Sequence, residues 1–121
     1  MNILIRTEKE EDYSGVYAVN KAAFGQDNEA KLVNQLRKSD AFVAGLSLVA
    51  CFGNKTIGHI LFTKLVIESQ KGIQYESLAL APMAVLPDYQ NMGVGSLMVK
   101  AGMERAKKLG FRSVIVLGHS N

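Results

Sequence analysis

The middle of the chain holds three consecutive segments with the composition of β-strands, and this run restricts the fold more than any other feature. Apolar residues fill most of residues 46–52, Ile, Leu, Phe, Thr and Val dominate residues 57–68, and a further segment covers residues 74–85. Residues 53–55 (Gly-Asn-Lys) and residues 70–72 (Gln-Lys-Gly) separate them with turn-forming residues. We therefore predict an antiparallel meander of three strands.

Helical patterns precede this meander. Residues 3–5 form a short apolar run, predicted as a strand, and Thr7 with Glu10 three residues later matches a capping box that would open a helix. Apolar residues then recur at helical spacing up to Gly25, which is expected to end this helix. Asn28 is expected to cap a second helix. Its apolar face is predicted to comprise Leu32, Val33 and Leu36.

A third helix and a last strand are predicted after the meander, over residues 93–109 and 113–117. The buried side of this helix is predicted to comprise Val94, Leu97, Met98, Ala101 and Leu109. The element order is then β-α-α-β-β-β-α-β. It predicts a single mixed α/β domain over residues 1–121, with strands and helices around one mixed sheet.

Length and composition restrict the class of protein. A chain of 121 residues is enough for one core and too short for two. Its single cysteine, Cys51, can form no disulfide within the chain, which is typical of a reducing, cytoplasmic setting. The longest uncharged stretch, residues 41–54, is shorter than the roughly 20 apolar residues that span a bilayer. The N-terminus lacks the pattern of a secretory signal, so we expect a cytoplasmic protein without a membrane partner.

The formal net charge of +3 suits an anionic partner. Basic residues gather within residues 100–112, and we interpret them as a solvated helix face. Nucleic-acid binding would need basic residues interleaved with exposed aromatic residues or a DNA-reading motif, and the chain has no Trp, four Tyr and five Phe. A nucleic-acid partner is therefore not expected.

The turn before the last helix carries the clearest functional signal. Gly93 and Gly95 stand at the start of that helix, where main-chain N–H groups converge and the helix dipole is positive. Met98 replaces the third glycine of a dinucleotide fingerprint, and no Gly-Lys-Ser/Thr follows as in a phosphate loop. The pattern predicts an anion site, and a glycine-tolerant helix start is the structural alternative.

The arrangement Gln90-x-x-Gly93-x-Gly95, placed after Met83-Ala-Val-Leu-Pro87 and before an amphipathic helix, resembles the acyl-CoA-binding motif of the GNAT acyltransferase superfamily. The predicted element order is similar to that fold as well. The resemblance implies transfer of an acetyl group from the cosubstrate acetyl-CoA to a primary amine of a small molecule or peptide. It implies neither a covalent enzyme intermediate nor a metal ion.

The resemblance also implies which residues bind the cosubstrate. The main chain of Met83 and Val85 would bind the pantetheine arm and polarise the thioester carbonyl. The amides of the following turn would hold the pyrophosphate, with a side-chain donor from Gln90. The full predicted set is Met83, Ala84, Val85, Gln90, Asn91, Met92, Gly93, Val94, Gly95 and Ser96.

The general base is predicted to be Glu76, near the start of the strand that leads to the acyl site, where many family members carry a catalytic carboxylate. A solvated edge residue is the alternative interpretation of Glu76, and Glu68 is a second candidate. His59 lies in the middle of a predicted strand and is interpreted as a packed or hydrogen-bonded core residue. His119 and Ser120 lack the acid partner and the nucleophile elbow of a hydrolase.

The C-terminal end differs from the family pattern. Family members continue beyond residues 113–117 into one more helix and two strands, which supply part of the acceptor pocket and usually the Tyr that acts as general acid. All four tyrosines of this chain precede that place, so none is assigned as the acid. We therefore expect acetyl transfer by the 121-residue chain to be weak or absent. We also expect a homodimer that covers the apolar edge of residues 113–117.

Two other function classes remain open. A noncatalytic acyl-CoA-binding or regulatory module would share the phosphate turn and lack the acceptor pocket and the acid. A small nucleotide-phosphate-binding domain of another kind would share the turn alone.

Overall fold

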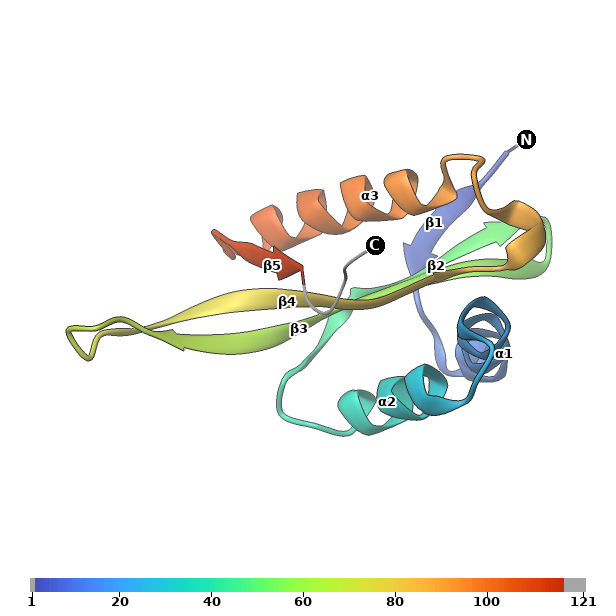
Figure 1. Cartoon of the computed structure of the whole chain (residues 1–121). Coiled ribbons are helices and arrows are strands. Elements are labelled where there is room, and N and C mark those ends of the chain that lie inside the picture. Colours follow the sequence, from blue (N-terminus) through green and yellow to red (C-terminus); the bar gives the residue numbers. More distant parts are fainter. Residues whose placement is uncertain (1, 117–121) are drawn as a thin grey trace.

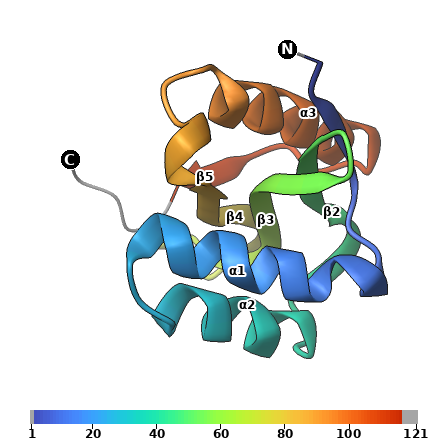
Figure 2. The same cartoon turned by 90° about the vertical axis from the view of Figure 1, so that its right-hand side faces the viewer.

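The computed structural model describes residues 2–116, which form a five-stranded sheet between two helical layers (Figure 1). Helices α1 and α2 cover one face and α3 covers the other, as Figure 2 also shows. The elements are β1 (Leu4–Thr7), the 3-10 helix η1 (Glu10–Asp12), α1 (Tyr13–Phe24), α2 (Asn28–Arg37), β2 (Phe42–Phe52), β3 (Lys55–Glu68), β4 (Gln74–Val85), the 3-10 helix η2 (Pro87–Tyr89), α3 (Val94–Lys108) and β5 (Val114–Val116). The predicted mixed α/β fold is confirmed. Leu117, His119 and Ser120 lie outside the described residues.

The strands lie in the sheet in their chain order. β1 to β4 pair antiparallel, and the predicted meander is β2, β3 and β4. β5 pairs parallel to β4, from Leu78 opposite Val114 to Leu80 opposite Val116. β3 and β4 continue beyond both neighbours as a two-stranded arm, residues 64–68 and 74–77, which projects from the body of the sheet (Figure 1).

The helix α3 packs against the sheet through small residues. Its buried positions are Val94, Met98, Gly102 and Ala106, which recur every four residues. A Cβ atom added at Gly102 would overlap the ring of Phe62 in β3, so glycine permits the close approach of helix and sheet there.

The predicted buried face of α3 is therefore partly wrong. Val94 and Met98 are buried, but Leu97 is 46% exposed and Leu109 is 54% exposed. The helix turns Gly102 toward Phe62, and the stripe of Val94, Met98, Gly102 and Ala106 leaves the two leucines on other sides of the helix. Within residues 2–116, no helix is both long and apolar enough to cross a membrane.

The start of the chain also differs from its prediction. Thr7 ends β1 and caps no helix, so the predicted capping box with Glu10 is wrong. The Asp12 carboxylate stabilises this segment instead. It accepts a hydrogen bond from the Lys9 main-chain N–H at 2.7 Å and two hydrogen bonds from the Arg6 guanidinium at 2.7 and 2.9 Å. The first helix ends as predicted, with Gly25 in the left-handed region at φ 71°.

Candidate functional site

The turn between β4 and α3 is shaped by two left-handed residues. Asn91 has φ 65° and Gly93, which precedes the first helical residue Val94, has φ 83°. No side chain caps this helix. The N–H groups of its first turn have no partner within the helix and point out of its N-terminal end. The turn thus presents main-chain donors at the positive end of a 15-residue helix.

An open groove of about 560 Å³ lies between this turn and the end of β4. All of the predicted cofactor-binding residues line it except Ala84 and Met92. Ala84 is 2% exposed and lies opposite His59, while Met92 is 57% exposed and lies outside the groove. The structure therefore brings together both ends of the predicted site, the strand end and the turn.

Met83 and Val85 present their main chain to a free strand edge. Leu86 donates its main-chain N–H to the carbonyl oxygen of Ile57 in β3 at 2.9 Å. Alternate residues of a strand direct their N–H groups to the same side, so the N–H of Ala84 also points toward β3. The N–H groups of Met83 and Val85 then point away from β3. β5 pairs with β4 only as far as Leu80, so within residues 2–116 no strand occupies this edge.

A β-bulge lies at the start of this free edge. Ile60 lies opposite Met83 and Phe62 opposite Leu80, so the single residue Leu61 faces both Ala81 and Pro82. A bulge of this kind bends its strand, and Met83, the first residue after it, lines the groove.

Gln90 lines the groove, and its predicted role as a side-chain donor to the pyrophosphate stays a prediction. Its side-chain Nε2 donates to the carbonyl oxygen of Val85 at 2.9 Å and ties the turn to the end of β4. Three groove residues were not predicted, namely Tyr89, Val99 and Lys100. Two of these residues could have been predicted from helical spacing. Val99 and Lys100 follow Gly95 and Ser96 by four residues and therefore lie on the same side of α3.

The model of the acetyltransferase (GNAT) family matches residues 8–121 of the chain. The chain belongs to the GNAT family. Among curated relatives of this GNAT chain, the uncharacterized N-acetyltransferase YjhQ of Escherichia coli is 38% identical over 109 residues. That alignment covers 90% of this chain and 60% of YjhQ, so the chain spans less than two thirds of this relative.

Solved structures of GNAT proteins have the same fold. A GNAT acetyltransferase of Brucella melitensis in complex with acetyl-CoA has a TM-score of 0.86 and 29% identity, over 99% of this chain and 78% of that chain. YhbS of Escherichia coli in complex with CoA has a TM-score of 0.85 and 30% identity, over 98% of this chain and 63% of that chain.

Glu76 is not brought to the groove of this GNAT chain. It is exposed on the β3–β4 arm, opposite Val66, and lies seven residues before Met83. At about 3.3 Å per residue, the two are roughly 23 Å apart along β4. Glu76 lines a separate hollow of about 500 Å³ with Tyr75 and Arg112, among others. Glu68 lies farther out on the arm, opposite Gln74.

His59 is fully buried, and its prediction as a hydrogen-bonded core residue is confirmed. Burial, and secondarily the positive charge of Arg37, lower the pKa of the imidazole from 6.5 to about 3. His59 is therefore neutral at physiological pH and has no route to a substrate in the groove.

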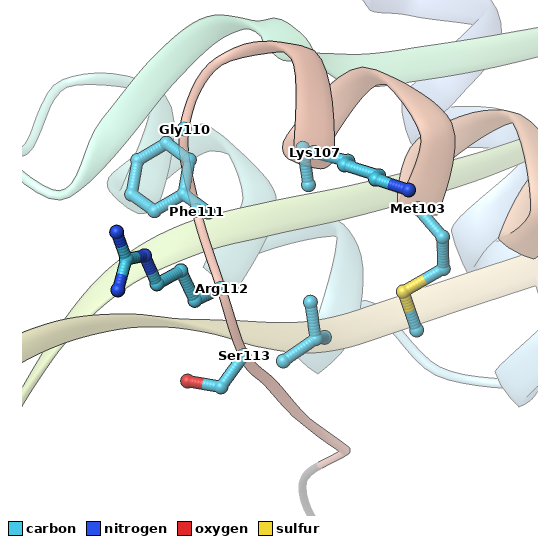
Figure 3. Close-up of a pocket in the computed structure, with 8 residues that line it drawn as sticks. Met103, Lys107, Gly110, Phe111, Arg112 and Ser113 are labelled. Carbon is cyan, nitrogen blue, oxygen red and sulfur yellow. The ribbon is translucent and has the colours of Figure 1, made fainter.

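A further hollow of about 600 Å³ lies at the other end of α3 in this GNAT fold. Figure 3 shows it between the last turn of α3, which carries Met103 and Lys107, and the segment of Phe111, Arg112 and Ser113. Its two cations, Lys107 and Arg112, belong to the basic run that the sequence predicts as a solvated helix face, but Arg112 lies beyond the end of α3. α3 is 15 residues long, so about 20 Å of helix separate this hollow from the turn between β4 and α3.

Proposed function

We propose that this chain is an N-acetyltransferase domain that binds acetyl-CoA in the groove between β4 and α3 and transfers the acetyl group to a primary amine. The observation that carries this proposal is that the groove has main-chain donors at both ends, at the free edge of Met83 and Val85 and at the uncapped N-terminus of α3. The complexes of the two structural relatives with acetyl-CoA and CoA support the same ligand.

The groove suits the chemistry of CoA along its length. The pantetheine arm is an extended chain with two amide groups, and it can add to a free strand edge as a further strand does. The pyrophosphate would then reach the N–H groups of Val94, Gly95 and Ser96. Lys100 lines the same groove and adds a positive charge.

The reaction needs three changes of charge. The amine must lose a proton to attack the thioester, the carbonyl oxygen becomes an oxyanion, and the thiolate leaves and takes up a proton. The N–H of Met83 or Val85 is the donor we propose for the oxyanion. We retain Glu76 as the proposed base. A general base acts within hydrogen-bond distance of the amine or through one water, so this proposal requires the bound acceptor to bring its amine and the Glu76 carboxylate that close together.

A noncatalytic acyl-CoA-binding module is the second candidate, and one observation favours it. Among the residues that line the groove, only Tyr89 and Lys100 have ionisable side chains. Neither is a carboxylate or an imidazole, so the groove offers main-chain donors and no ordinary general base. Turnover with an amine distinguishes the enzyme from the binding module.

Calorimetric titration with CoA, acetyl-CoA and ATP tests the proposal. We expect CoA and acetyl-CoA to bind and ATP to bind more weakly, because ATP lacks the pantetheine arm. Gly93→Glu places bulk and negative charge at the pyrophosphate position and should abolish binding, whereas Gly72→Glu, another left-handed glycine in the turn of the β3–β4 arm, should not. Unchanged affinity in a folded Gly93→Glu variant would falsify the proposal.

We further propose that residues 1–121 act as one domain in the cytoplasm and form a homodimer through β5. Ile115 is 36% exposed and Val116 is 63% exposed. Within residues 2–116, no strand pairs with the outer edge of β5. An apolar strand edge of this kind favours pairing with a second copy.

A further inference from the structure

Five polar side chains form a continuous buried chain on the sheet face that α1 and α2 cover. They come from five different parts of the sequence, namely Glu8, Asn20 of α1, Arg37 of α2, Ser47 of β2 and His59 of β3. Arg37 donates to Glu8 with Nε at 3.2 Å and with a terminal nitrogen at 2.6 Å. Ser47 Oγ lies 2.9 Å from Glu8 Oε1 and 3.0 Å from His59 Nε2. Asn20 Nδ2 lies 3.4 Å from His59 Nδ1.

The Glu8 carboxylate, at one end of this chain of hydrogen bonds, determines which atom donates in each of them. A carboxylate paired with Arg37 can only accept, so the single hydroxyl proton of Ser47 goes to Glu8. Ser47 Oγ must then accept from His59, which places the imidazole proton on Nε2. Nδ1 is left as an acceptor and faces the Asn20 amide nitrogen, which also donates to the Val16 carbonyl at 3.0 Å. These hydrogen bonds agree with one neutral tautomer of His59, and the buried Asn20 Oδ1 has no partner among the described residues.

The chain is buried almost completely. The side chain of Glu8 is 2% exposed and that of Arg37 is 10% exposed, and Asn20 and His59 are fully buried. A buried polar group that loses its partner costs more than an ordinary hydrogen bond contributes, so such a chain is stable only in one arrangement. The chain therefore fixes the relative positions of α1, α2, β2 and β3.

This arrangement lies directly behind the proposed acyl site. His59 lies opposite Ala84, the residue between Met83 and Val85. Directly opposed residues of paired strands share a face of the sheet, so the imidazole packs on the reverse side of the segment whose edge would bind the cosubstrate. Asn20 connects the same imidazole to α1.

We propose that His59 is a positioning residue of the acyl site: its hydrogen bonds to Ser47 and Asn20 fix β3 against β2 and α1, and β3 in turn pairs with the segment of Met83, Ala84 and Val85. The inference rests on the proposed binding of CoA at that segment. His59 does not touch the cosubstrate in this proposal, and it acts by keeping the strand edge and α1 in one geometry.

The tautomer can be tested without any ligand. In protein labelled with ¹⁵N in the histidine ring, we expect a protonated Nε2 and an unprotonated Nδ1 at neutral pH, and the same pattern after CoA is added. Ser47→Ala should alter the Nε2 signal, because it removes the acceptor. A proton on Nδ1 of the wild-type protein would overturn the proposed hydrogen-bond chain.

The positioning role is tested by CoA affinity in matched variants. His59→Leu should weaken CoA binding by about tenfold, because a small displacement of a binding edge costs much of its affinity. His59→Gln keeps a donor toward Ser47 and should retain most of the CoA affinity of the wild-type protein. Val33→Ala is the control, since Val33 of α2 is buried as well and belongs neither to the polar chain nor to the lining of the groove. It should leave the affinity unchanged.

The outcomes separate this inference from the proposed function. If the wild-type protein binds no CoA, the proposed function fails and the positioning role fails with it. If the wild-type protein binds CoA and His59→Leu binds it as tightly as Val33→Ala does, only the positioning role is overturned. Should His59→Leu not fold, Ser47→Ala takes its place. We then expect Ser47→Ala to weaken CoA binding and the control variant to bind CoA as the wild-type protein does.

Discussion

The side chain of Gln90 donates a hydrogen bond of 2.9 Å to the main-chain carbonyl of Val85. This bond joins the turn between β4 and α3 to the end of β4, five residues earlier in the chain. The two parts of the proposed site, the free edge of β4 and the open N-terminus of α3, are thereby held at a fixed separation. A side chain that the family resemblance assigns to the ligand thus stabilises the unliganded turn.

Gln90→Ala tests this link. Without the amide donor the turn can open, and we expect CoA affinity to fall roughly two- to tenfold, the equivalent of one net hydrogen bond of about 0.5–1.5 kcal/mol. Calorimetry measures the affinity, and Gln74→Ala, an exposed glutamine at the other end of β4, is the control. An affinity equal to that of the wild-type protein would show that the bond does not contribute to the site.

Gly102→Ala tests the close packing of α3 against β3. The added Cβ would overlap the ring of Phe62, so we expect a loss of about 1–2 kcal/mol in the free energy of unfolding, although alanine favours helices. Urea denaturation measures it. Gly95→Ala is the control, because its Cβ would lie 3.6 Å from Met83 Cε, an ordinary contact. A more stable Gly102→Ala protein would contradict the packing described here.

The meander and the buried side of α3 show what the sequence could and could not predict about the fold. The meander was predictable because turn residues punctuate it at residues 53–55 and 70–72, and so was the end of α1 at Gly25. The buried stripe of α3 was not, because glycine and alanine carry little hydropathy and the stripe follows them. Periodicity finds large apolar residues, whereas close packing depends on the space between two elements.

The candidate site was predictable to a similar degree. The glycines located the turn, and the strand before it located the free edge, because both signals are local in sequence. The inward direction of Gln90 was not predictable, since sequence gives the residue type and not its rotamer. The polar chain around His59 was missed for another reason, because Glu8 and Ser47 are separated by 39 residues and no local pattern links them.

Stability should depend on pH through His59. The folded-state pKa is lowered from 6.5 to about 3, so between these values the unfolded chain binds a proton that the folded protein does not. Stability therefore falls as the pH drops below 6.5 and does not change through this group above it. The slope contributed by one such group approaches about 1.4 kcal/mol per pH unit.

Urea unfolding at several pH values measures this slope, and His59→Gln should reduce it. The pKa of the Asp12 carboxyl is lowered by its hydrogen bonds with Arg6, so its own effect on stability lies near and below its ordinary value of 3.8. Measurements between about pH 5 and 6.5 therefore report the imidazole of His59 rather than the Asp12 carboxyl. Equal slopes for the two proteins would show that the imidazole is protonated in the folded state.

The proposed dimer should depend on the β5 edge. Val116→Lys places a charge on an exposed residue of that strand, and lysine at a strand edge opposes pairing with another chain. We expect the wild-type protein to sediment as a dimer at micromolar concentration and the variant as a monomer. Val66→Lys, at a 60% exposed residue on the β3–β4 arm, is the control and should remain dimeric. A wild-type monomer would rule out the proposed interface.

The last prediction concerns the base. If Glu76 takes up the amine proton, Glu76→Gln should reduce the rate of acetyl transfer by about a hundredfold, the lower end of what general-base catalysis contributes, and leave CoA affinity unchanged. Affinity should not change because Glu76 is exposed on the arm and does not line the groove. The release of free thiol over a panel of amines measures the rate, and Glu104→Gln, at an exposed residue of α3 outside the lining of the groove, is the control. Turnover that survives Glu76→Gln intact would assign proton removal to solvent at the free edge of β4 and leave Glu76 as a surface residue.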